Sequence, residues 1–285
     1  NYTLRLYFRK VKVVNKPARF SSTIYVSNHP ASFMDPVLLA PFNRAVVFFM
    51  TRSDVFTAFT KPFFWMAHMI PIYRQRDGVN TKEKNQAVFK KSSEILLGKR
   101  SLVIFGEGVT DDVFIRRLKP LKKGAVRIGF TALESCNWER DIYLATIACN
   151  YSNPAQFRSD VVIRNSKKIL LNEFRTEYES NPNKIIQELT VRLEGMLKND
   201  LIHVNDEESA EFTEQMMLIQ RKGMPMFEEN TVPLLDRWNY AKDLVEDFNK
   251  NPGKYAALRA PVKGYFEGLK VRNIDDQKLY DATYN

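Results

Sequence analysis

The sequence contains few of the residues that build disulfide and metal sites. It has two cysteines and three histidines in 285 residues. Cys136 and Cys149 imply no disulfide framework, and so few cysteines fit a reducing compartment or the cytoplasmic face of a membrane. Neither residue type occurs as the His-x-x-x-His or Cys-x-x-Cys pair that zinc sites use, so we expect no metal site.

Several motifs and one kind of segment are also absent. The chain has no Walker phosphate loop, no Gly-x-Gly-x-x-Gly fingerprint and no Gly-x-Ser-x-Gly nucleophile elbow. It also lacks an unbroken run of about 20 apolar residues, the length that spans a bilayer as a helix. These absences argue against a nucleotide enzyme and a serine hydrolase. They favour a base that activates a substrate hydroxyl directly.

Two apolar segments are each open to two interpretations. The aromatic stretch at residues 55–73 is interrupted by Lys61 and Pro62. It fits either a helix of the core or an aromatic surface that docks against a bilayer. Residues 2–12 mix aromatic, aliphatic and basic positions, which fits either the end of an interfacial helix that leads into a strand or a plain edge strand.

The charge of the chain is unevenly distributed. The net charge is +10, and residues 1–150 hold 24 Lys and Arg against 11 Asp and Glu, whereas residues 151–285 hold 19 against 22. A basic half of this kind favours an anionic partner, such as a phosphate-bearing substrate or an acidic lipid surface. The alternative is a set of solvated lysines that keep the protein soluble. We expect no nucleic-acid partner, because no helix-turn-helix, zinc-finger or RNA-binding signature accompanies the charge.

Strand and helix patterns alternate along the first 150 residues. Amphipathic helical patterns separate apolar runs that are typical of buried strands, at residues 23–26, 44–50, 101–105 and 141–148. This alternation predicts an α/β fold, with a mixed, largely parallel sheet flanked by helices and a site at the strand ends. Residues 159–163 and 168–171 are predicted to be edge strands.

Helical patterns dominate the remainder of the chain, at residues 183–198, 207–221, 235–249 and 254–270. We therefore predict a core at residues 1–175 and a C-terminal helical appendage at residues 176–285, packed on or beside the core.

The stretch Asn28–Pro36 contains a histidine and a carboxylate that are candidates for a base and its orienting partner. His29 follows a strand pattern, and Asp35 comes six residues later. Six residues of continuous helix turn through about 600°, which would place the two side chains on different faces. The two can meet only if their link is partly non-helical, and Pro30 and Pro36 favour such a break. By contrast, His68 and His203 are predicted to be structural.

Three further groups of residues have side chains suited to a polar or anionic substrate. Glu107 is flanked by glycines at the end of a buried strand, where Gly108 allows a ligand to approach the backbone closely. Arg74 and Arg76 carry guanidinium groups that suit phosphate oxygens. Lys122 precedes a predicted helix N-terminus, which attracts anions. The alternative for each group is a solvated turn or surface side chain.

Read in order, these segments resemble the glycerolipid acyltransferase family. The motifs are Asn-His…Asp, Ile-Pro-Ile-Tyr-Arg, Phe-x-Glu-Gly and Leu-Lys-x-Gly-Ala, and the resemblance covers roughly residues 10–165. The family includes lysophosphatidate (1-acyl-sn-glycerol-3-phosphate) and glycerol-3-phosphate acyltransferases. Each motif is weak alone, but four in this order at plausible separations are quite specific.

The resemblance implies a role for each matching residue. His29 would be the general base on the acceptor hydroxyl, and Asp35 would orient it and stabilise its charge. The hydroxyl would attack the thioester of acyl-CoA or acyl-carrier protein, a co-substrate rather than a bound cofactor. Arg74 would bind the acceptor's phosphate, and Glu107 with Gly108 would hold its glycerol portion. Tyr143–Ile147 resembles the apolar fourth block near the acyl chain. The full set of expected substrate-binding residues is Asn28, Arg74, Arg76, Glu107, Gly108 and Lys122.

Two departures from the family pattern concern the acceptor. Five residues separate His29 from Asp35, where the usual motif has four; this matches a variant with Asn-His-Pro-x-Ser-Phe-x-Asp-Pro. The third block continues Val-Thr-Asp-Asp, so it gains the acids Asp111 and Asp112 where the family usually has a cation. These acids favour a less anionic acceptor, such as a lyso-aminolipid.

The sequence therefore predicts an O-acyltransferase that moves a fatty acyl group from a thioester to the hydroxyl of a lysophospholipid or glycerol 3-phosphate. The basic half and the aromatic stretch lead us to expect it at a membrane lipid surface, on the cytoplasmic face. Two alternatives stay open. One is an acyltransferase for another lyso-lipid, and the other is a non-catalytic membrane lipid-binding module.

Overall fold

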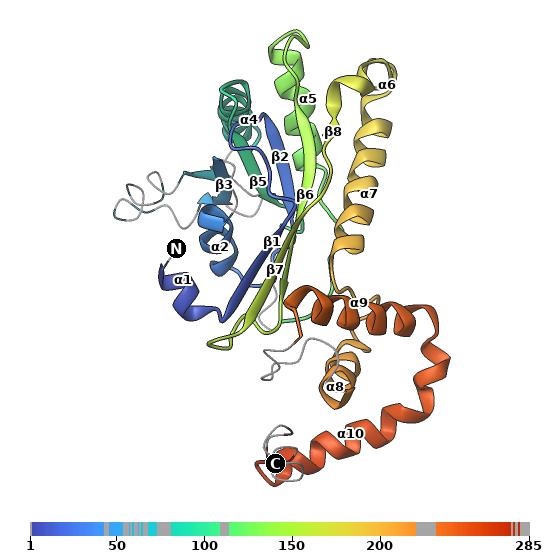
Figure 1. Cartoon of the computed structure of the whole chain (residues 1–285). Helices are drawn as coiled ribbons and strands as arrows, with labels where there is room; N and C mark the ends of the chain where they lie inside the picture. The colour runs from blue at the N-terminus through green and yellow to red at the C-terminus, as the bar shows by residue number, and fades with distance from the viewer. Residues whose placement is uncertain are drawn as a thin grey trace.

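A computed structural model describes residues 2–42, 46–53, 57, 59, 62, 64, 68–72, 81–108, 114–220, 232–274, 276 and 279. They form one β-sheet flanked by helices (Figure 1). The strands are β1 (Lys10–Val14), β2 (Thr23–Ser27), β3 (Val47–Arg52), β4 (Met69–Ile72), β5 (Ser101–Phe105), β6 (Tyr143–Tyr151), β7 (Asp160–Asn165) and β8 (Ile169–Leu170). The α-helices are α1 (Tyr2–Tyr7), α2 (Met34–Phe42), α4 (Thr81–Leu97), α5 (Gly124–Ser135), α6 (Arg175–Ser180), α7 (Pro182–Asp200), α8 (Ala210–Gln220), α9 (Leu234–Lys250) and α10 (Ala256–Val271).

The sheet confirms the predicted mixed, largely parallel arrangement. Its strand order is β1-β7-β6-β2-β5-β3-β4, and β8 also pairs with β6. Among the described strands, the antiparallel pairs are β6 with β7 and β6 with β8, and the other pairs are parallel. Because β2, β5 and β6 run in the same direction, their carboxyl ends meet at one edge of the sheet, where ligand sites of such folds lie.

The prediction that residues 159–163 form an edge strand is wrong. β7 lies inside the sheet, with β1 on one side and β6 on the other. The partner on the outer side, β1, comes from the N-terminal segment, and Lys10 is level with Asp160 in the register. The apolar run of β7 is therefore buried on both faces, which is typical of an interior strand.

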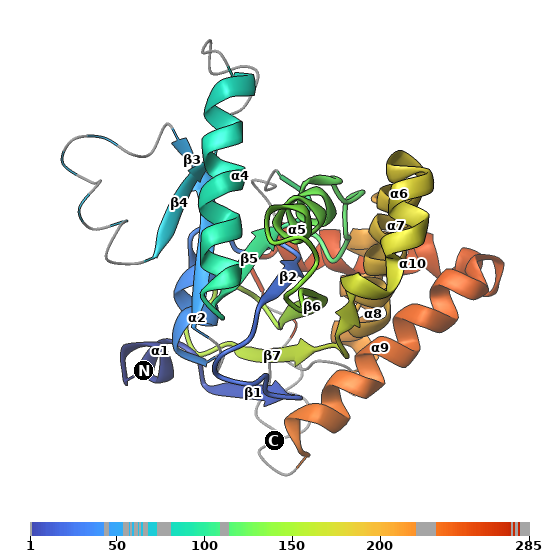
Figure 2. The same ribbon diagram turned by 90° about the horizontal axis from the view of Figure 1, so that it is seen from above.

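Each face of the sheet packs against its own helices. In β2, Ile24 and Val26 face a core formed with α4, α5 and α7, whereas Tyr25 faces the opposite core with α2 and the segment around Phe8. This alternation follows from the two-residue period of a strand. Figure 2 shows α4, α5 and α7 together on one face of the sheet. A Cβ on Gly129 of α5 would lie 2.4 Å from a methyl carbon of Leu171, so a larger residue here would force the Leu171 side chain to shift.

The predicted C-terminal helical appendage is confirmed, and its helices pack in two different ways. α7 buries Ile185, Leu189 and Leu193 in the first core, beside α5. α9 packs through Trp238 against Val162 of β7. α8, α9 and α10 share a further apolar cluster, and Figure 1 shows α10 as the part of the chain farthest from the sheet. The boundary at residue 175 stays a prediction.

Candidate active site

The structure brings His29 and Asp35 together. β2 ends at Ser27, and the chain turns through residues 30–33 before α2 begins at Met34. Ser32 in this turn has a φ of 49°, a left-handed conformation that interrupts the helix. As a result, Nδ1 of His29 lies 2.8 Å from Oδ2 of Asp35. The requirement for a non-helical link between the two residues is confirmed.

The carboxylate of Asp35 is fully buried and hydrogen-bonded at both oxygens. Oδ2 faces Nδ1 of His29 and accepts the backbone N–H of Ala31 at 3.0 Å, while Oδ1 accepts the hydroxyl of Tyr151 at 2.7 Å. Burial, and after it the charge of Asp35, raises the pKa of Tyr151 well above its usual range. The phenol therefore stays protonated and donates. Tyr151 was not predicted as a site residue, and its one signal in the sequence was its position at the end of an apolar strand.

The imidazole of His29 is held by its face as well as by its edge. Its ring is stacked on the ring of Phe105, the last residue of β5, with centroids 3.9 Å apart and planes 10° apart. An aromatic face in this position also stabilises an imidazolium. With Nδ1–H directed to Asp35, the neutral ring has Nε2 as its acceptor. The His29 side chain is 20% exposed, so a substrate can reach it.

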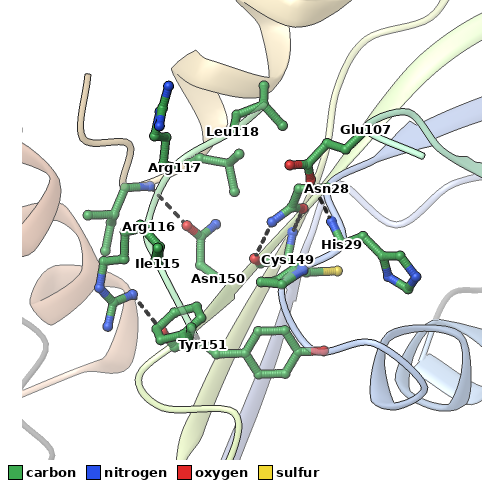
Figure 3. A pocket seen from close by; sticks show the side chains of 14 residues that line it. Asn28, His29, Glu107, Ile115, Arg116, Arg117, Leu118, Cys149, Asn150 and Tyr151 are labelled. Carbon is green, nitrogen blue, oxygen red and sulfur yellow. Dashed lines mark hydrogen bonds between the residues drawn. The ribbon is translucent and has the colours of Figure 1, made fainter. Parts of the chain in front are cut away.

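Glu107 binds two backbone groups from separate segments. Oε1 accepts the N–H of His29 at 2.9 Å, and Oε2 accepts the N–H of Lys119 at 3.0 Å. Burial raises the pKa of Glu107, and the hydrogen bonds from Lys119 and His29 oppose that rise. The carboxylate thus ties the loop after β5 to the turn that carries His29 (Figure 3). Its predicted role in holding glycerol stays a prediction.

Glycine is favoured on both sides of Glu107, by side-chain crowding at Gly106 and by a left-handed backbone at Gly108. A Cβ on Gly106 would lie 2.7 Å from a methyl carbon of Leu121 and 2.8 Å from one of Val26. Gly108 has a φ of 69°, a conformation that favours glycine. The exposed side chain of Lys122 lies over Gly108. The backbone N–H of Lys122 donates to the carbonyl of Gly106 at 2.8 Å. The structure therefore brings Lys122 beside the Glu107 loop.

Asn28 links two strands at the edge of the sheet. Its Nδ2 donates to the carbonyl of Cys149 at 3.0 Å, and its Oδ1 accepts the N–H of Cys149 at 2.8 Å (Figure 3). This pair of hydrogen bonds holds the end of β2 against β6. Burial, and then the charge of Asp35, raises the pKa of Cys149 well above its usual range, so its thiol is a poor nucleophile. A substrate-binding role for Asn28 stays a prediction.

A small cavity lies at these strand ends, between the segment that follows β5 and the end of β6. Its volume is about 30 Å³, enough for about two water molecules. Figure 3 shows the imidazole of His29 turned away from Asn28 and Glu107. The lining residues include Asn28, His29, Glu107, Arg116, Asn150 and Tyr151.

The remaining histidines make structural contacts. The ring of His68 is stacked on Phe48, with centroids 4.4 Å apart. Nδ1 of His203 accepts the N–H of Leu118 at 3.1 Å. Burial, followed by the charges of Lys198 and other nearby groups, lowers the pKa of His203 to about 4, so it is neutral at pH 7.

Some predictions fall outside the part of the chain that the structure describes. Arg74 and Arg76 are among them, as is most of the aromatic stretch at 55–73. Within the described residues, no three His, Cys, Asp or Glu side chains gather in a way that would hold a metal ion. None of the described helices is long and apolar enough to cross a membrane.

One comparison with known proteins, the match to a family model, covers most of the residues of this site. The family model described as Acyltransferase matches residues 10–150, the segment that holds His29, Asp35 and Glu107. Among solved structures, the chain is similar to the 1-acyl-sn-glycerophosphate (LPA) acyltransferase PlsC from Thermotoga maritima, with a TM-score of 0.42 and 16% sequence identity over 66% of this chain and 71% of that chain. No curated protein matches the sequence. By the family match and by the order of its motifs, the chain belongs to the acyltransferase family, whose glycerolipid members its motifs resemble.

Proposed function

We propose that this acyltransferase moves a fatty acyl group from a thioester to the hydroxyl of a lysophospholipid or glycerol 3-phosphate. The observation that carries the proposal is the His29–Asp35 pair, with Nδ1 held at 2.8 Å from the carboxylate and the ring partly exposed at the strand ends. Such a pair suits a general base, because the buried carboxylate fixes the imidazole and stabilises its protonated form.

The proposed reaction needs no enzyme nucleophile. Nε2 of His29 takes the proton of the acceptor hydroxyl while the hydroxyl oxygen attacks the thioester carbonyl. A carbon–oxygen bond forms, and the carbonyl becomes a tetrahedral oxyanion. When the oxyanion collapses, the carbon–sulfur bond breaks and the imidazolium returns its proton to the leaving sulfur. The products are the acylated lipid and the free thiol of the carrier, which is coenzyme A or acyl-carrier protein.

Two features support a location at a lipid surface on the cytoplasmic face. The basic half of the chain suits anionic headgroups. In addition, the large apolar side chains of Leu6, Phe33 and Phe157 are about two-thirds exposed. Phe33 lies in the turn between His29 and Asp35, so a lipid surface that contacts Phe33 also lies close to the proposed base.

The test is thiol release from acyl-CoA, measured with a panel of lyso-lipids and glycerol 3-phosphate, and repeated with acyl-carrier protein as donor. The wild-type protein should release thiol with at least one acceptor. His29→Ala should lower turnover by about 10²- to 10⁴-fold. His68→Ala, which removes a histidine outside the site, should not. Wild-type turnover in His29→Ala would contradict the proposed mechanism. Binding to anionic liposomes without thiol release from either donor would favour a lipid-binding module.

The same panel separates the candidate acceptors. Asp111 and Asp112 follow the third block and lie outside the described residues. Acids at this point repel a doubly anionic phosphate and attract an amine. Faster turnover with a lyso-aminolipid than with lysophosphatidate would therefore assign the protein to the former acceptor.

A further inference from the structure

The two oxygens of Asp35 have different partners. Oδ2 faces Nδ1 of His29 and the N–H of Ala31, whereas Oδ1 receives the hydroxyl of Tyr151 at 2.7 Å. Asp35 is fully buried, so solvent does not compete for Oδ1. A carboxylate held at both oxygens cannot rotate about its Cβ–Cγ bond without losing a hydrogen bond. The Tyr151 contact therefore fixes the orientation in which Oδ2 meets the imidazole.

Tyr151 is itself anchored by elements outside the His29 turn. It pairs with Val161 of β7, and its carbonyl accepts Nη1 of Arg116 at 2.6 Å. Its ring lies against Phe8, with centroids 5.9 Å apart. Arg116 in turn is ion-paired with Glu214 of α8. The phenol is thus a fixed donor from β6, directed at a carboxylate that belongs to α2.

We propose that Tyr151 is a positioning residue for the general base. Its hydroxyl holds the Asp35 carboxylate in the orientation that meets His29. The same hydrogen bond draws off part of the negative charge with which Asp35 stabilises the imidazolium. The inference rests on the proposed function, because it assigns His29 as the base. Tyr151 contacts Asp35 rather than a reacting atom, so its effect on the reaction passes through Asp35.

Tyr151→Phe keeps the ring and removes the hydroxyl. The variant should show about 10- to 100-fold lower kcat, the range expected for losing a hydrogen bond to a charged group, with little change in the acceptor's KM. The remaining charge on Asp35 acts more strongly on the His29 proton, so the imidazolium persists to higher pH. The acid limb of the kcat/KM profile should therefore move to higher pH.

Tyr25→Phe is the matched control. Tyr25 is a buried tyrosine of the same core cluster, and its hydroxyl lies beside Ser21 and Thr23, at the opposite end of β2 from His29. This variant also loses a buried hydroxyl, so it reports the effect of that loss on stability alone. The kcat of Tyr25→Phe and the acid limb of its kcat/KM profile against pH should match those of the wild type.

A second variant shifts the profile in the opposite direction without removing the contact. Fluorotyrosine at position 151 is a stronger donor, so it should draw more charge from Asp35 and move the acid limb to lower pH. Wild-type kcat and an unmoved acid limb in both position-151 variants would overturn the inference.

A spectroscopic measurement separates this inference from the proposed function. The ¹⁵N resonances of the His29 imidazole, followed against pH, should move in Tyr151→Phe and not in Tyr25→Phe, whether or not an acceptor is known. If the wild-type protein releases no thiol but the resonances move in this way, the proposed function fails, while the coupling of Tyr151 to His29 through Asp35 stands. If thiol is released and the resonances do not move, the positioning role fails alone.

Discussion

Two regions of the molecule each contain a buried aspartate, and the two carboxylates have different partners. Asp35, at the His29 turn, is bound by a histidine, a tyrosine hydroxyl and a backbone N–H. Asp160, at the start of β7, accepts two hydrogen bonds from Arg9, at 3.0 Å and 2.6 Å, and lies 3.0 Å from Arg237 of α9. The two residues are 0% and 1% exposed.

Burial is equal, so the partners decide what each carboxylate can do. An imidazole can accept a proton and return it, which allows the Asp35 cluster to take part in proton transfer. Guanidinium groups keep their charge throughout the accessible pH range, so the Asp160 cluster is electrostatically fixed. Its consequence is structural, because it joins the N-terminal segment and α9 to β7.

The largest effect should come from neutralising the carboxylate at the site. Asp35→Asn removes the charge that stabilises the imidazolium, and we expect turnover to fall by about 10²- to 10⁴-fold. The measurement is thiol release by folded protein, with folding checked by circular dichroism. The matched variant is Asp160→Asn, which makes the same chemical change outside the site and should keep its turnover per folded molecule. Equal losses in both variants would remove the distinction between the two clusters.

The second effect is on stability. Asp160→Asn removes the buried carboxylate that Arg9 and Arg237 share, and we expect the free energy of unfolding to fall by about 3–5 kcal/mol. Urea denaturation, with wild type and Asp35→Asn side by side, measures the change. Stability unchanged in Asp160→Asn would show that this cluster does not hold the N-terminal segment and α9 in place.

His203 is a partly buried titratable group whose contacts are structural, so its removal should change stability and leave turnover unchanged. Its pKa falls from 6.5 to about 4 on folding, so its contribution to stability is complete above pH 6.5 and is lost as the pH drops toward 4. His203→Gln keeps an acceptor for the Leu118 N–H and removes this titration. The melting temperature of the variant should therefore fall less than that of wild type between pH 6.5 and 4, while turnover at pH 7 stays the same. The structural role would be contradicted if the melting temperatures of variant and wild type fell equally between pH 6.5 and 4, or if the variant lost turnover at pH 7.

The smallest effect concerns an arginine–carboxylate pair at the surface, which has the same chemical groups as the buried Asp160 cluster. Arg175 and Glu179 of α6 lie 2.7 Å apart, and both side chains are more than half exposed. Arg175→Ala should lower the free energy of unfolding by only about 0.3–0.5 kcal/mol, because water and salt screen the pair. A loss as large as that of Asp160→Asn would mean that burial is not what separates the two arginine–carboxylate contacts.

The site divides into parts that the sequence predicts and parts that it does not. His29 and Asp35 are close in the chain, so their meeting required only a break in the helix, which the prolines indicated. Tyr151 lies 116 residues after Asp35, and only the placement of β6 next to β2 brings its hydroxyl to the carboxylate. A tyrosine in an apolar strand pattern gives no sign of such a partner.

The same limit applies to the fold. Alternating strand and helix patterns predicted the sheet, but they contain no information about which strand becomes its edge. The order was decided by β1, whose register with β7 joins Lys10 to Asp160. Likewise, the side chain of Asn28 makes two hydrogen bonds to the backbone of Cys149, 121 residues away. The residue pattern does not indicate which main-chain groups a side chain will contact.

The pairing of β1 with β7 also has a consequence for biosynthesis. β1 precedes every other described strand, yet its partner begins 150 residues later, at Asp160. A chain emerging from the ribosome must therefore keep an unpaired strand and the apolar side chain of Phe8 in solution until β7 has been made. An unpaired strand of this kind invites pairing with other chains. We therefore expect nascent chains that stop before Asp160 to depend on chaperones, and chains that extend beyond Asn165 to be released from them.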